Sequence, residues 1–62
     1  MDVFKQHFAA YMTLVQLTKT LTELVKNGQN ELAYTLKMFY EMKEKEREYI
    51  ENVMPGYLAN NN

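Results

Sequence analysis

The sequence contains no cysteine and no serine, a single proline (Pro55), a single histidine (His7) and two glycines among its 62 residues. Without cysteine the chain forms no disulfide, and one histidine is too few for a zinc site made from this chain alone. There is no serine or cysteine nucleophile and no glycine-rich loop that could hold a phosphate. We therefore expect no enzyme activity, no cofactor and no bound metal.

An excess of charge of one sign is also missing. Seven Lys and Arg against eight Asp and Glu give a net charge of −1, so no basic field attracts nucleic acid. An apolar content of 47% argues against disorder. No uncharged apolar run is long enough for a membrane span, and the first residues lack the order of a signal peptide. These features predict a cytoplasmic protein without a membrane segment.

The few glycines and the proline divide the chain into two long segments. Asn27-Gly28 can close a helix, and Pro55-Gly56 ends the second segment. We expect an all-α fold with helices over about 2–27 and 30–54, capped by Asp2 and Asn30. The short turn at 27–30 requires antiparallel packing, which gives one helical-hairpin domain over 1–56.

The segment 57–62 ends in three asparagines, and we expect it to be a flexible C-terminal tail. Its apolar residues Tyr57 and Leu58 leave two alternatives open. The tail could fold back over the open end of the hairpin, or it could serve as a short peptide that a partner binds.

The apolar stripe of the first helix is unusually wide. It covers roughly 200° of the helix surface, whereas a surface helix needs about 100°. One neighbouring helix cannot cover it, and a 62-residue chain is marginally stable alone. We therefore expect a homodimer, most simply a four-helix bundle. The residues predicted to form this self-association surface are Phe4, Phe8, Tyr11, Leu14, Leu17 and Leu21.

Charged residues interrupt the core side of the second helix at Lys43, Glu46 and Arg47. The purely structural interpretation is a solvated helix with ion pairs along its surface, such as Glu44 with Arg47 and Glu41 with Lys45. The alternative is a charged layer that sets partner choice or register in a bundle.

His7 lies within the apolar stripe of the first helix. In an antiparallel hairpin, facing residue numbers sum to about 57, which places His7 near Ile50 with Glu46 and Glu51 within reach. A structural histidine bonded to a carboxylate is one interpretation. The other is a pH-sensitive contact, because histidine titrates near neutrality.

A second apolar strip follows the second helix on a different side from its core residues. Methionine adapts to irregular surfaces and tyrosine is favoured at protein interfaces, so the strip predicts a protein-binding face. It could be the self-association surface or a docking face for another protein. Its members are Tyr34, Met38, Met42 and Tyr49.

These features favour a small non-enzymatic regulator of the inhibitor or adaptor type, like those of phages and accessory bacterial systems. It would bind another protein and form a homodimer. Two alternatives stay open. A hairpin dimer could bind nucleic acid through Lys5, Lys19 and Lys26, although the acidic balance disfavours it. The chain could also be a structural subunit of a larger assembly.

Overall fold

The first helix, α1, spans Val3–Lys26 in the computed structural model, which describes residues 2–60. The predicted cap at Asp2 is confirmed, because its carboxylate accepts from the backbone N–H groups of Phe4 (3.0 Å) and Lys5 (3.4 Å). Lys26 in the last turn suits the negative end of the helix dipole.

The turn after α1 depends on Gly28. Its φ of 104° lies in a region of backbone conformation that residues with a Cβ atom rarely adopt. The N–H of Gln29 donates to the carbonyl of Leu24 at 3.1 Å, which closes the helix end. The predicted cap at Asn30 is wrong. Asn30–Leu32 form a 3-10 turn, η1, with no side-chain cap, and α2 begins after it at Ala33.

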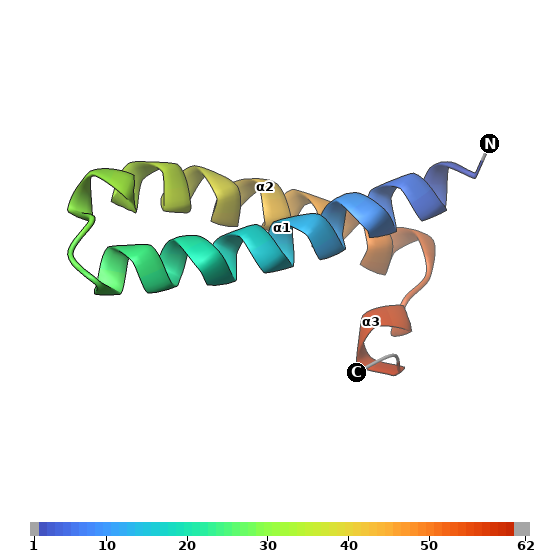
Figure 1. Ribbon diagram of the computed structural model, residues 1–62. Coiled ribbons are helices and arrows are strands. Elements are labelled where there is room, and N and C mark those ends of the chain that lie inside the picture. Colours follow the sequence, from blue (N-terminus) through green and yellow to red (C-terminus); the bar gives the residue numbers. More distant parts are fainter. Residues whose placement is uncertain (1, 61–62) are drawn as a thin grey trace.

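The second helix, α2, spans Ala33–Val53 and packs antiparallel to α1, so the predicted helical hairpin is confirmed (Figure 1). The core between the helices is thin. Among residues 2–60, the only apolar side chains that are buried are Leu14 and Ile50, and Thr18 is buried with them. The hydroxyl of Thr18 donates to the carbonyl of Val15 at 3.0 Å, so its burial leaves no polar atom unsatisfied.

The chain turns back after α2, where the sequence suggested a flexible tail over 57–62. Gly56 has a φ of 82°, and Tyr57–Asn60 form a short helix, α3, which follows α2 and lies to one side of the open end of the hairpin (Figure 1). The ring of Tyr57 packs edge-on against Phe4 and Phe8, with centroids 5.1 and 5.4 Å apart. The backbone N–H of Gly56 donates to the Glu51 carboxylate at 3.2 Å. These contacts order the start of the tail, while residues 61–62 lie outside the described residues.

The hairpin is long and narrow. Its radius of gyration is 13.2 Å, whereas a compact domain of this length has about 10.6 Å. Its accessible surface of 4673 Å² exceeds the roughly 4200 Å² expected for a compact monomer of 7.4 kDa. Over residues 2–60, two long helices, one 3-10 turn and one short helix therefore leave much of the apolar surface open to water.

Candidate functional site

One side of the hairpin carries an exposed apolar surface that both long helices share. A shallow groove on this side is lined by Ala10 and Thr13 from α1 and by Met42 from α2. Leu17 follows Thr13 by one helical turn, and Met38 precedes Met42 by one turn, so both extend the same surface. Leu17, Met38 and Met42 are 40%, 45% and 48% exposed. We call this surface the bare face and define it by Ala10, Thr13, Leu17, Met38 and Met42.

The part of α1 that borders the bare face has no charge. Helical spacing places only small or uncharged side chains there. The charged residues of α1 point elsewhere, and Lys19 and Glu23 line a groove on the opposite side of the hairpin. The uncharged members are Gln6, Ala9, Ala10, Thr13, Gln16, Leu17, Thr20 and Leu24.

The opposite side of the hairpin is polar by comparison. The hydroxyls of Thr22 and Tyr40 lie 3.4 Å apart across the two helices. The Nζ atom of Lys43 lies 4.8 Å from the centroid of the Tyr40 ring, within the range of a cation–π contact. Tyr40 therefore has partners within the chain, although it is as exposed as Met38.

His7, Glu46 and Tyr49 form a cluster toward the open end of the hairpin. Nδ1 of His7 lies 2.6 Å from Oε2 of Glu46, and the imidazole stacks on the ring of Tyr49 with a centroid distance of 3.8 Å. An ionised carboxylate only accepts hydrogen bonds, so the Nδ1–H group donates. The cluster joins the two helices at one height and thereby fixes their register. The sequence placed Glu46 within reach of His7, and the structure confirms that proximity.

The structure divides the predicted strip on α2. Tyr34 is 71% exposed, and Met38 and Met42 lie on the bare face. Tyr49 is half-buried because its ring stacks on His7. Helical spacing alone suggested a single strip. In the structure its last member, Tyr49, packs against His7 of α1 instead.

The predicted self-association residues of α1 are divided as well. Leu14 is buried in the hairpin, Tyr11 and Leu21 are half-buried, and Phe4 and Phe8 pack on Tyr57. Leu17 stays exposed. The sequence treated the two helices separately and missed that Leu17, Met38 and Met42 share one face. The antiparallel register of the two helices is the sequence signal from which this shared face could have been inferred.

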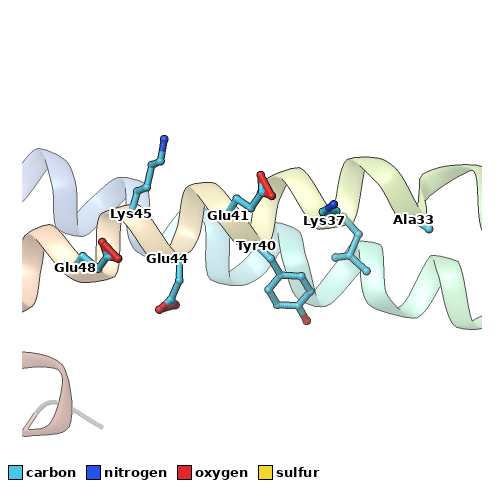
Figure 2. A pocket seen from close by; sticks show the side chains of 8 residues that line it. Ala33, Lys37, Tyr40, Glu41, Glu44, Lys45 and Glu48 are labelled. Carbon is cyan, nitrogen blue, oxygen red and sulfur yellow. The ribbon is translucent and has the colours of Figure 1, made fainter.

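A second shallow groove follows the outer side of α2, and Figure 2 shows its side chains along one helix. Leu36 and Tyr40 form its apolar part, and residues of both charge signs surround them. This pattern is that of a solvated helix surface, which is one of the two interpretations of the charged stretch. The remaining lining residues are Ala33, Lys37, Glu41, Glu44, Lys45 and Glu48.

Ion pairing on this outer side is local. The Arg47 guanidinium lies 2.6 Å from the Glu44 carboxylate, which confirms the predicted pair. The hydrogen bond from Arg47 lowers the pKa of Glu44, and the same bond raises the pKa of Arg47. Both side chains are exposed, so this pair contributes little to stability.

The comparisons with known proteins give no relative. No protein-family model matches the chain, and neither the curated proteins nor the solved structures include a match. Among residues 2–60, no helix is long and apolar enough to cross a membrane.

Proposed function

We propose that this chain is a non-enzymatic regulator of the inhibitor or adaptor type, and that the bare face is a surface through which it binds protein. One observation carries the proposal. Met42 lines a groove between the two helices, and helical spacing extends this exposed surface to Leu17 and Met38, in a hairpin whose described residues bury only two apolar side chains. Small proteins rarely leave such a surface open, and contiguous apolar patches usually mark binding sites.

The chemistry of the bare face suits a protein ligand. Methionine is enriched at protein interfaces because its flexible side chain fills irregular gaps. The uncharged border on α1 offers nothing to neutralise phosphates, so it gives no support to nucleic-acid binding. Lys45, at the edge of the groove, is accompanied there by Glu46.

A photo-crosslinking residue placed at single positions tests this proposal. Benzoylphenylalanine replaces Met38 in one variant and Tyr40 in the other, because both side chains are 45% exposed but lie on opposite sides of the hairpin. We expect irradiation of cells that produce the chain to give protein adducts at position 38 and few at position 40. Equal labelling of the two positions, or no protein adduct at position 38, would contradict the proposal.

A further inference from the structure

We infer that the bare face is covered by a second copy of this chain, arranged so that α2 of each protomer lies across α1 of the other. This inference rests on the proposed function, because it names the partner of the same face. It also specifies which helices meet and at which residues.

The thin core is the first reason to choose a second copy. Among residues 2–60, Leu14 and Ile50 are the only fully buried apolar side chains, and the other apolar side chains between the helices are at most half-buried. A chain this short is marginally stable by itself, so association would add to the stability of its fold. A second copy is the one partner that is present wherever the chain is produced, and its concentration equals that of the chain itself.

The size of the bare side fits a dimer interface. The molecule measures 38 by 22 Å across its two longest dimensions, so the rectangle that encloses its broad side, α3 included, is roughly 800 Å² and is an upper limit for a flat interface there. A standard stable interface buries about 800 Å² on each partner. A second copy would therefore have to cover most of this side to reach the standard size.

The shape of the bare face complements itself. On α1 the side chains of Ala10 and Thr13 are short and protrude little from the face. On α2 the longer side chains of Met38 and Met42 protrude further. A two-fold axis parallel to the helices sets Met42 of each protomer over the short Thr13 of the other, and Met38 over Leu17, so that apolar contact accompanies a long side chain placed over a short one.

The other symmetric arrangement packs less well. A two-fold axis across the helices would place α1 on α1 and α2 on α2, with short residues facing short ones and methionines facing methionines. It would also bring Lys45, close to the midpoint of α2, near its own copy. Voids and a like-charge contact both disfavour that arrangement.

The favoured axis also fixes the register between protomers. Rotation about an axis parallel to the helices leaves the height of each residue along the bundle unchanged. Thr13 and Met42 line the same groove within one protomer, so they lie at similar heights. Met42 of one protomer is therefore expected over Thr13 of the other, and Met38 over Leu17.

Disulfide crosslinking tests this register cleanly because the chain has no cysteine of its own. Thr13→Cys and Met42→Cys are made as separate chains, mixed in equal amounts, unfolded, refolded together and oxidised. A disulfide requires close Cβ atoms, so we expect the mixed 13–42 disulfide to exceed each symmetric disulfide by about tenfold. A Lys19→Cys chain, with its cysteine on the opposite side of the hairpin, should give no excess of the mixed product with Met42→Cys.

Circular dichroism checks that each variant is helical, and Leu17→Cys with Met38→Cys provides a second pair if one of the first variants fails to fold. Predominance of the symmetric 13–13 and 42–42 disulfides would overturn the proposed arrangement. A monomer in sedimentation at all concentrations would overturn the second copy as partner. If position 38 still gave photo-adducts with a different protein, the proposed function would survive that result, whereas no adduct would contradict both proposals.

Discussion

His7 on α1 and Glu46 on α2 are joined by a 2.6 Å contact between Nδ1 and Oε2, 39 residues apart in the sequence. Both side chains are half-buried, and the imidazole also stacks on Tyr49. The histidine therefore holds the charged stretch of α2 against α1. This contact explains how Glu46 occupies a position on the core side of its helix without being left unpaired.

Removing either partner of this contact should destabilise the hairpin. We expect His7→Gln and Glu46→Gln each to lower the free energy of unfolding by about 1 kcal/mol, because a partly buried hydrogen bond to a charged group is lost. A double-mutant cycle should give a coupling of about 0.5–1.5 kcal/mol. Chemical denaturation at one fixed protein concentration measures these values.

Glu41→Gln is the matched control, since Glu41 is exposed on the outer side of α2, and its effect should stay within about 0.5 kcal/mol. A coupling near zero would contradict the structural role of His7.

Tyr57 should contribute to stability although it lies in the last few residues of the chain. We expect Tyr57→Ala to cost about 1–3 kcal/mol in the free energy of unfolding, because two edge-on ring contacts are lost. Tyr57→Phe keeps both rings in contact and should lose less than half as much. Thermal and denaturant unfolding of the two variants provide the measurement, and an unchanged stability of Tyr57→Ala would show that α3 does not hold α1.

The sequence predicted the hairpin well because local rules decide its main features. Asp2 caps α1 through its own side chain, and Gly28 supplies a backbone conformation that few residues adopt. Local rules do not decide which segment covers an apolar face. Phe4 and Phe8 were therefore expected to contact a second chain, but Tyr57 of the same chain packs on them. Periodicity likewise placed Tyr49 with Met42, and only the tertiary contact with His7 separates them.

The Glu44–Arg47 pair predicts a weak pH dependence with a definite sign. The pKa of Glu44 is lowered in the folded chain by its hydrogen bond from Arg47, so the pair stabilises the fold above the ordinary titration range of a carboxyl group. This contribution is lost as the pH falls through the lowered pKa. The raised pKa of Arg47 keeps the guanidinium charged throughout this range.

We therefore expect Glu44→Gln to lower the melting temperature slightly at pH 7 and to have no effect near about pH 2, where carboxyl groups are protonated. High salt should reduce the difference at pH 7, because the pair is exposed. Glu41→Gln again serves as the control. If Glu44→Gln lowered the melting temperature more at acid pH than at neutral pH, the result would contradict a stabilising Glu44–Arg47 pair.

Gly28 should be required for its backbone conformation alone. A Cβ atom added there meets nothing within 4 Å, so no clash contributes to the effect of Gly28→Ala. We expect this variant to lose about 1–2 kcal/mol in the free energy of unfolding, because φ stays positive, and Gly28→Asn to lose less. Neither change touches the bare face, so self-association of the folded chain should persist. A neutral Gly28→Ala would mean that the turn can relax to another conformation.

Sedimentation equilibrium over a wide concentration range, with circular dichroism on the same samples, tests most directly whether the bare face associates. Leu17→Glu and Met12→Glu form a matched pair, because Leu17 is 40% and Met12 41% exposed on different sides of α1. We predict that the wild-type chain and Met12→Glu sediment as helical dimers that lose helix on dilution, and that Leu17→Glu forms no folded dimer. A wild-type chain that stays helical and monomeric, or a Leu17→Glu variant that dimerises as well as Met12→Glu, would contradict self-association through the bare face.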